Sequence, residues 1–203
     1  MMKVGILALQ GDVIEHIRAT NEAAKSLNFS CEIVEVRTKF DFSNLNGLII
    51  PGGESTVLHK LCEREKIFEE IKKIPVIFGT CAGAIFLVKK LNNKESEQKT
   101  LELMDVEIDR NGYGRQNESF EHDIETELGQ IHAIFIRAPR IKSIGSEVKV
   151  LAKLNDEIVA CEQRTINNTY LLTCFHPELS TTKFHEYFLK NLRSTATPID
   201  LKS

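Results

Sequence analysis

The sequence lacks the features by which membrane, nucleic-acid-binding and secreted proteins are recognised. Its apolar runs stay well below the roughly 20 residues that a membrane span needs, and its first residues, MMKVGILALQGD, carry no cleavage site of a signal peptide. There is no dense run of Lys and Arg, and 26 basic against 29 acidic residues give a net charge of −3. We therefore expect neither a nucleic acid nor a membrane as a partner.

Disulfide, metal and cofactor signals are also missing. The five cysteines are odd in number and show no C-x-x-C spacing, so a disulfide framework and a zinc site are both poorly supported. Reduced thiols and a cytoplasmic location follow as the expectation. No cofactor motif, repeat or linker is present, so we predict no cofactor, no metal, and a single domain over residues 1–193 with a mobile tail at 194–203.

Strand and helix patterns alternate over the first 91 residues. Buried-strand patterns are expected at 3–9, 31–37, 47–50 and 74–78, and helical patterns at 12–27, 55–73 and 82–91. This β-α order favours a parallel sheet covered by helices on both faces.

The pattern changes after residue 91, where strands follow one another without long helices. We expect strands at 104–111, 118–127, 132–139 and 169–175, a hairpin over 148–163 that turns at Asn155–Asp156, and a closing helix at 181–192. The predicted fold class is therefore a three-layer α/β domain: a mostly parallel central sheet with helices on both faces and an antiparallel extension.

A cysteine between two glycines marks the strongest candidate site. The stretch GTCAG, residues 79–83, joins a buried strand to a helix, which is the pattern of a nucleophile elbow. The elbow would lift Cys81 clear of the backbone at a helix N-terminus, where the thiolate is favoured. The N–H of Ala82 would point to where an oxyanion forms. The alternative is a buried structural cysteine with packing glycines.

A base for this thiol is suggested by FHPE near the C-terminus. His176 and Glu178 lie two residues apart after an apolar strand, so they would face the same way, and Glu178 could orient the imidazole. The alternative is a turn with a surface ion pair. Of the other histidines, His132 is expected to be structural, and surface positions are expected for His16, His59, His122 and His185.

A third element, PGGEST at residues 51–56, also ends a strand. Gly52 and Gly53 would let backbone N–H groups approach a ligand, and Ser55 could cap the next helix. A plain strand-to-helix turn is the alternative reading.

Together these three elements, in this order, resemble class I (triad) glutamine amidotransferases, a family with a flavodoxin-like fold. The segments GILALQGDVIEH, PGGEST, GTCAGAI, RNGYGRQNESFE, FIRAPRI and FHPEL are similar in particular to the glutaminase subunits of pyridoxal 5′-phosphate synthases. The quoted segments run from Gly5 to Leu179, and LALQGD, RNGYGRQ and FIRAPRI are the more specific ones.

The resemblance implies a Cys-His-Glu triad made of Cys81, His176 and Glu178, which hydrolyses L-glutamine through a γ-glutamyl thioester. It implies that the N–H groups of Gly53 and Ala82 form the oxyanion hole. The glutamine-binding positions that it implies are Gly52, Gly53, Glu54, Arg110, Ile136 and Arg137. An arginine fork matches a carboxylate, although structural salt bridges are the alternative for both arginines.

The resemblance also implies a partner. Ammonia would pass to a separate, barrel-shaped pyridoxal 5′-phosphate synthase subunit in a hetero-oligomeric complex. Gln10, at the end of the first strand, could sense that partner, or be an ordinary loop amide. Three alternatives stay open: a glutaminase subunit for a different synthase, another cysteine hydrolase on this fold, and a catalytically silent regulatory module.

Overall fold

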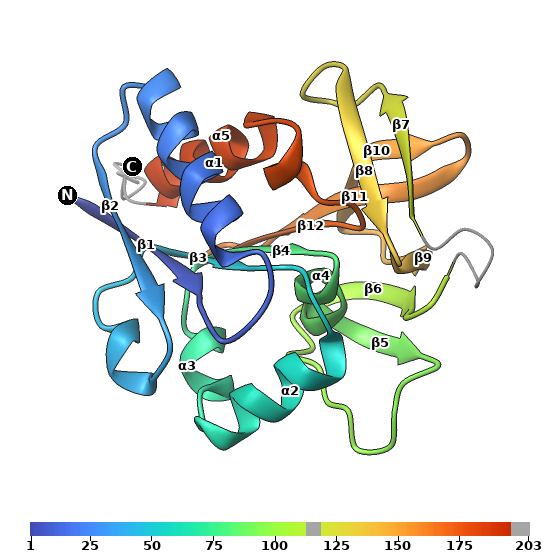
Figure 1. The fold of residues 1–203 in the computed structure, drawn as a ribbon, viewed down its shortest axis with the longest axis horizontal. Helices are drawn as coiled ribbons and strands as arrows, with labels where there is room; N and C mark the ends of the chain where they lie inside the picture. Colours follow the sequence, from blue (N-terminus) through green and yellow to red (C-terminus); the bar gives the residue numbers. More distant parts are fainter. Residues whose placement is uncertain (113–118, 196–203) are drawn as a thin grey trace, which may run out of the picture.

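The computed structural model describes residues 1–112 and 119–195. Its centre is a seven-stranded sheet, and the arrangement of the elements around it can be followed in Figure 1. In spatial order the strands are β10 (Val148–Leu154), β11 (Glu157–Arg164), β12 (Thr169–Thr173), β4 (Val76–Thr80), β3 (Gly47–Ile50), β1 (Met2–Leu7) and β2 (Cys31–Val36). The five strands from β12 to β2 pair in parallel, and β11 and β10 extend the sheet antiparallel.

Helices cover both faces of this sheet, which confirms the predicted three-layer class. On one face lie α1 (Val13–Ser26) and α5 (Lys183–Thr195), and on the other lie α2 (Ser55–Arg64), α3 (Phe68–Lys72) and α4 (Ala82–Leu87) (Figure 1). The strands β3 and β4 are buried along their whole length because both faces are covered. Phe78 of β4 packs on Phe184 and Phe188 of α5, with ring centroids 6.4 and 6.2 Å apart.

Two small sheets lie outside the main sheet; their pairs are antiparallel except for β5 with β6, which is parallel. One joins β5 (Val88–Asn92), β6 (Met104–Asp109) and β9 (Arg140–Ile144), and the other joins β7 (Ser119–Ile124) and β8 (Ile131–Ile136). Two short 3₁₀ helices, η1 (Lys39–Phe42) and η3 (Pro177–Leu179), complete the elements in the described part of the chain. Among the described helices none is both long enough and apolar enough to cross a membrane.

The helix predicted at 82–91 is wrong in its second half, which is strand β5. The carbonyls of Phe86 and Leu87, which would accept bonds from the next helical turn, instead accept the N–H groups of Leu101 and Leu103 at 2.7 and 2.9 Å. Tertiary pairing with a distant segment therefore ends the helix although its apolar spacing continues.

The single helix predicted at 55–73 is two helices. Lys66 has a φ of 55°, its N–H bonds to the carbonyl of Glu63, and the N–H of Ile67 bonds to the carbonyl of Cys62. This is a Schellman motif, which ends α2. The usual signal for it is glycine, and the sequence has lysine there.

The remaining boundaries differ in smaller ways. The hairpin turns at Asn155–Asp156 as predicted, whereas the strand predicted at 132–139 ends at Ile136 and β9 was not predicted. The helix α5 reaches Thr195, so the tail predicted from residue 194 overlaps its last turn. Part of RNGYGRQ, the first residue of the strand predicted at 118–127, and residues 196–203 lie outside the described residues.

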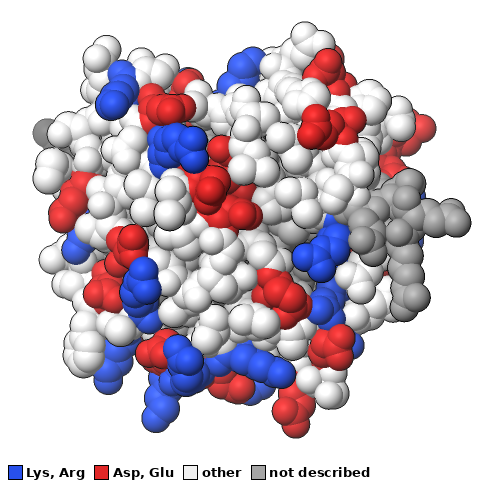
Figure 2. All heavy atoms as spheres, viewed as in Figure 1, with Lys and Arg blue, Asp and Glu red and all other residues white. Residues whose placement is uncertain are grey.

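Charges of both signs are interspersed over the face of the molecule shown in Figure 2. Many of the ion pairs are exposed and local, as between Lys73 and Glu70 at 2.9 Å. Such pairs contribute at most about 1 kcal/mol each, so the buried layers between sheet and helices, rather than surface charge, hold the site in place.

Candidate active site

The candidate site lies where four neighbouring parallel strands end. Thr80 of β4 pairs with Thr173 of β12, and Ile50 of β3 pairs with Gly79, so the loops after these strands begin at one edge. In open α/β sheets this edge is where ligands bind. A pocket of about 250 Å³ opens there, lined by Asp12, Gly53, Glu54, Ser55, Cys81, Ile85, Arg110, Asn111, Ile136, Arg137 and His176.

Cys81 occupies a strained turn between β4 and α4. Its φ of 48° and ψ of −103° are disfavoured for an L-residue, and its N–H is held by the carbonyl of Thr173 at 2.9 Å. A Cβ on Gly79 would lie 2.5 Å from the carbonyl oxygen of Gly83, so strand and helix approach closely only because both positions are glycine. The Sγ lies 3.8 Å from the carbonyl oxygen of Ile136. This geometry agrees with the predicted elbow.

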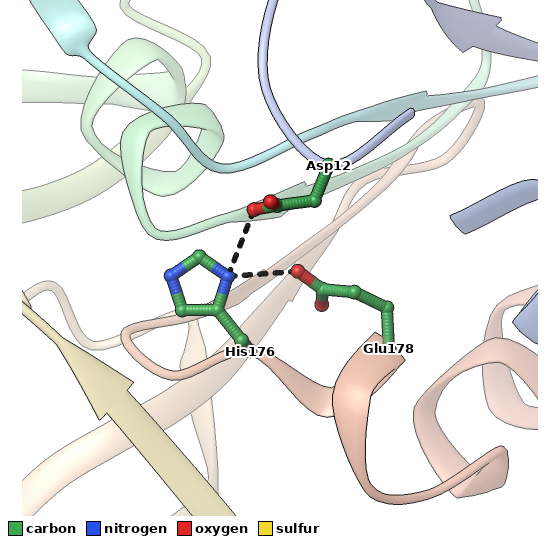
Figure 3. A group of neighbouring side chains, drawn as sticks. All are labelled: Asp12, His176 and Glu178. Carbon is green, nitrogen blue, oxygen red and sulfur yellow. Dashed lines mark hydrogen bonds and ion pairs between the residues drawn. The ribbon is translucent and has the colours of Figure 1, made fainter. Parts of the chain in front are cut away.

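His176 is held by two carboxylates rather than one (Figure 3). Its Nδ1 lies 2.8 Å from Oε1 of Glu178, at the start of η3, and 3.2 Å from Oδ2 of Asp12, in the loop after β1. Because Nδ1 is turned to the carboxylates, Nε2 is left for the thiol of Cys81, whose hydrogen bond also raises the pKa of His176. The three residues expected to form the triad are thus brought together.

Sequence reasoning missed Asp12. The available signal was its place: Asp12 follows β1, and the carboxyl end of β1 lies on the same sheet edge as the other loops. It was read instead only as the start of a helix.

Burial and hydrogen bonding oppose each other at the triad. Burial alone would lower the pKa of His176, but hydrogen bonds to Asp12, Cys81 and Glu178 outweigh it and raise this pKa to about 12. Burial raises the pKa of Glu178, and the bond to His176 counters part of that rise. The bond to His176 lowers the pKa of Asp12. The site therefore favours the imidazolium form of His176, which lies beside the thiol of Cys81.

The two N–H groups expected to bind an oxyanion come from separate backbone segments, one at Ala82 and one at Gly53. Ala82 is the first residue of α4, so its N–H has no acceptor inside the helix. Gln10 holds the glycine loop from behind: its Nε2 donates to the carbonyl of Gly52 at 3.3 Å and its Oε1 accepts the N–H of Glu54 at 3.0 Å. The carbonyl of Gly52 and the N–H of Gly53 point in opposite directions in one peptide plane. Gln10 therefore sets the direction of the Gly53 N–H.

The two arginines expected to bind glutamine differ in what they already contact. The guanidinium of Arg110 bonds to Glu54 at 2.6 Å, Glu95 at 2.9 Å and Ser55 at 3.1 Å, so it is largely committed. The exposed Arg137 has a φ of 44°, and within the described residues no carboxylate pairs with it. A ligand carboxylate therefore finds the freer partner in Arg137.

The sequence suggested Ser55 as the N-terminal cap of α2, but the structure shows that the cap is Glu54. Both carboxylate oxygens of Glu54 accept backbone bonds, from Thr56 at 3.0 Å and Val57 at 2.7 Å. The hydroxyl of Ser55 instead accepts a bond from Arg110. The loop is thereby fixed beside the pocket.

Three of the four histidines expected at the surface are buried. His16 and His185 are fully buried and His59 is 3% exposed, which contradicts the prediction, while His122 is exposed as expected. The reason is that the apolar faces of α1, α2 and α5 include them, and polar partners contact both ring nitrogens of His16, Nε2 of His185 and Nδ1 of His59. His132, expected to be structural, lies exposed between Glu121 and Asp123.

The same geometry meets the spacing of a metal site. One ligand atom from each of Asp12, His176 and Glu178 lies within 4.8 Å of the other two. The proton on Nδ1 of His176 fills the place between the two carboxylates, so hydrogen bonding explains the cluster without an ion.

Known proteins resemble this chain over most of its length. A model of the SNO glutamine amidotransferase family matches residues 6–194. A pyridoxal 5′-phosphate synthase subunit PdxT from Korarchaeum cryptofilum (strain OPF8) is 43% identical over 199 residues, 94% of this chain and 98% of that protein. The protein of the same description from Pyrococcus horikoshii is 44% identical over 200 residues, 94% of this chain and all of that protein.

A solved structure is similar over the same length. The crystal structure of a glutamine amidotransferase superposes with a TM-score of 0.81 at 43% identity and covers 94% of this chain and 98% of that one.

Proposed function

The chain belongs to the SNO glutamine amidotransferase family, and from this premise we propose that it is the glutaminase subunit of a pyridoxal 5′-phosphate synthase. It hydrolyses L-glutamine to L-glutamate and ammonia, and the ammonia passes to a synthase subunit. The observation that carries the proposal is the strained Cys81, placed beside an imidazole that two carboxylates hold.

The reaction proceeds in two halves. The thiolate of Cys81 attacks the side-chain amide carbon of glutamine, and the resulting oxyanion is held by the N–H groups of Gly53 and Ala82. The imidazolium of His176 gives its Nε2 proton to the departing nitrogen, which leaves as ammonia and yields the γ-glutamyl thioester. Water then attacks the thioester, His176 takes its proton, and the thiolate departs from a γ-carboxyl group that ionises to give glutamate.

Each residue of the pocket has a task in recognising glutamine. Arg137 binds the α-carboxylate because, of the two arginines that line the pocket, only Arg110 has a carboxylate partner among the described residues. Arg110 and Glu54 lie together in the pocket wall, and the Glu54 carboxylate is the group that we assign to the α-amino group of glutamine. The carbonyl of Ile136, beside Sγ, accepts an N–H of the amide and so favours glutamine over glutamate.

Gln10 connects the oxyanion hole with the partner. Rotation of the Gly52–Gly53 peptide would present a carbonyl where an N–H is needed, and losing one such donor costs about 10²–10³ in rate. Gln10, in the β1–α1 loop, holds this peptide through hydrogen bonds to the carbonyl of Gly52 and the N–H of Glu54. A synthase docked against that loop would set the productive rotation, so the isolated chain should be a poor glutaminase. The cytoplasmic location stays a prediction.

The test uses glutamine labelled with ¹⁵N in its side-chain amide. The chain is assayed with and without the purified synthase subunit, and we expect labelled pyridoxal 5′-phosphate and faster glutamate release only with both. Ammonium chloride added to a Cys81→Ala complex should restore product, which shows that the synthase is intact. Glutamate without labelled pyridoxal phosphate would favour a different synthase, and no glutamate under any condition would favour a silent module.

A further inference from the structure

The two oxygens of the Glu178 carboxylate face different surroundings. Oε1 accepts the Nδ1 proton of His176 at 2.8 Å, on the pocket side. Oε2 is fully buried and has no hydrogen bond within the described residues that meets ordinary geometry. The ring of His16 approaches it, with Nε2 3.5 Å away. A buried carboxylate oxygen without a donor is costly, so the state of His16 matters to Glu178.

His16 belongs to a buried group behind the triad. Its Nε2 lies 3.1 Å from the hydroxyl of Thr80, the residue before the nucleophile, and its Nδ1 lies 2.9 Å from Nε2 of His185. The two rings come from α1 and α5 and pack edge-on against Phe78. Neither ring is exposed to solvent, so both are fixed in place.

The contacts decide where the protons lie. One proton is shared between His16 Nδ1 and His185 Nε2, and the Nδ1 of His185 is buried without a partner in the described chain. If His185 carries its proton on Nε2, the unpartnered Nδ1 is only a lone pair. The opposite tautomer would bury an unsatisfied N–H and turn a lone pair of His16 toward Glu178. The first arrangement is the favourable one.

We propose that His16 is a positioning residue of the catalytic site: held by His185 as the Nε2–H tautomer, it directs that proton at Thr80 and at Oε2 of Glu178. This rests on the proposed glutaminase function. The 3.5 Å contact is long, as catalytic contacts often are before substrate binds. The donor keeps Glu178 ionised despite its burial and keeps Oε1 on His176. Burial lowers the pKa of both His16 and His185, which supports two neutral rings.

The first test is kinetic and uses the full chain with the synthase subunit. His16→Leu fills the space without the donor and should lower kcat for glutamine about 10- to 100-fold with little change in KM. His16→Gln, whose amide can donate near the Nε2 position, should recover most of this loss. His59→Leu is the matched control, because His59 is equally buried but contacts Lys99 and Glu63 instead of the triad.

Coupling separates positioning from simple packing. In a Glu178→Gln background, His16→Leu should cause no further loss of kcat, since its target is already changed. If the losses multiply, or if His59→Leu lowers kcat as much as His16→Leu, the proposal is overturned.

A spectroscopic readout does not depend on activity. In protein with ¹⁵N-labelled histidine, His16 should show a protonated Nε2 and an unprotonated Nδ1, and His185→Phe should remove this fixed tautomer. A His16 ring with its proton on Nδ1 would refute the proposal even in an active enzyme. A wild-type complex that releases no glutamate would instead count against the proposed function and leave the tautomer result standing on its own.

Discussion

Glu178 separates two buried histidines whose pKa values are shifted in opposite directions, His176 on its pocket side and His185 on its interior side. On the pocket side, His176 lies between carboxylates and a thiol, and its pKa is raised to about 12. On the interior side, His185 packs edge-on against Phe78, and burial lowers its pKa to about 3. Glu178 touches both regions, through Oε1 and Oε2. Charge partners, and not burial alone, decide whether a buried histidine is a cation.

The difference separates reactivity from stability. Pocket-side groups line the proposed glutamine pocket and include strained backbone, as at Cys81 and Arg137. Interior-side groups are neutral and fill space between α1, α5 and β4. Substitutions on the pocket side should therefore change rates more than stability, and those on the interior side the reverse, apart from His16, which bridges the two.

The largest effect is expected at the nucleophile. Cys81→Ala removes the group that attacks the amide, so glutamine hydrolysis by the complex should fall to the background rate while the unfolding midpoint stays close to that of the wild type. Glutamate release and thermal unfolding measure the two properties. Normal turnover in the folded variant would falsify the assignment of Cys81.

A smaller loss is expected at the boundary between the regions. His176→Asn should lower kcat by about 10²–10⁴, the range for a general acid–base group. Glu178→Gln should lose less, because Asp12 also holds Nδ1 of His176. The double variant Asp12→Asn/Glu178→Gln should then approach His176→Asn. Steady-state kinetics of the three variants decide this order, and a Glu178→Gln enzyme slower than His176→Asn would contradict it.

The two arginines should differ in binding rather than chemistry. Losing a charged hydrogen bond costs about 1.5–3 kcal/mol, so Arg137→Gln should raise KM for glutamine about 10- to 100-fold with a smaller change in kcat. Arg110→Gln should change KM less and lower the unfolding midpoint more, because Arg110 ties Glu54 to Glu95. Equal KM shifts without loss of stability would erase the distinction.

The neutral His185 on the interior side should make the free energy of unfolding depend on pH. His185 has an ordinary pKa of 6.5 when unfolded and about 3 when folded, so below pH 6.5 the unfolded chain binds a proton that the folded chain refuses. Stability therefore falls as pH drops from 6.5 toward 3, by up to about 1.4 kcal/mol per pH unit. Urea unfolding at pH 7 and pH 5 should show a smaller acid loss in His185→Phe than in the wild type; identical losses would argue against a neutral buried ring.

The smallest effect concerns backbone strain. The φ and ψ of Cys81 suit glycine, whose mirror-image conformations are free of Cβ clashes. Cys81→Gly should be more stable than Cys81→Ala by about 1 kcal/mol, measured by urea unfolding. A less stable glycine variant would mean that the turn carries little strain.

Much of the catalytic geometry was predictable because it depends on short chain segments. The elbow GTCAG and the pair in FHPE each follow a buried strand, and parallel strands end at one edge, so Cys81 and His176 could be brought together from sequence. Asp12 could have been placed at the same edge because it follows β1, although its contact with His176 could not be foreseen. His16 gave no such signal, since its contact with Glu178 joins α1 to the C-terminal part of the chain. A helical pattern alone does not tell a buried histidine from an exposed one.

Two parts of the fold were missed for different physical reasons. The strand β5 was hidden because its residues continue the apolar spacing of α4, and only pairing with the segment around Leu101 ends that helix. The end of α2 was hidden because Lys66 adopts a conformation that usually signals glycine. In both places long-range or unusual local contacts outweigh intrinsic preference.

The pairing of Thr80 with Thr173 limits which changes of length β4 and β12 can tolerate. Each strand residue advances about 3.3 Å and reverses the facing side. Deleting one residue from β4 or β12 would thus carry Cys81 or His176 a full residue step along its strand and turn it away from the pocket. Apolar substitutions inside these strands keep the number of residues and therefore the position of both side chains. A scan of single substitutions and single deletions in β4 and β12 should therefore find active apolar substitutions but no active deletion.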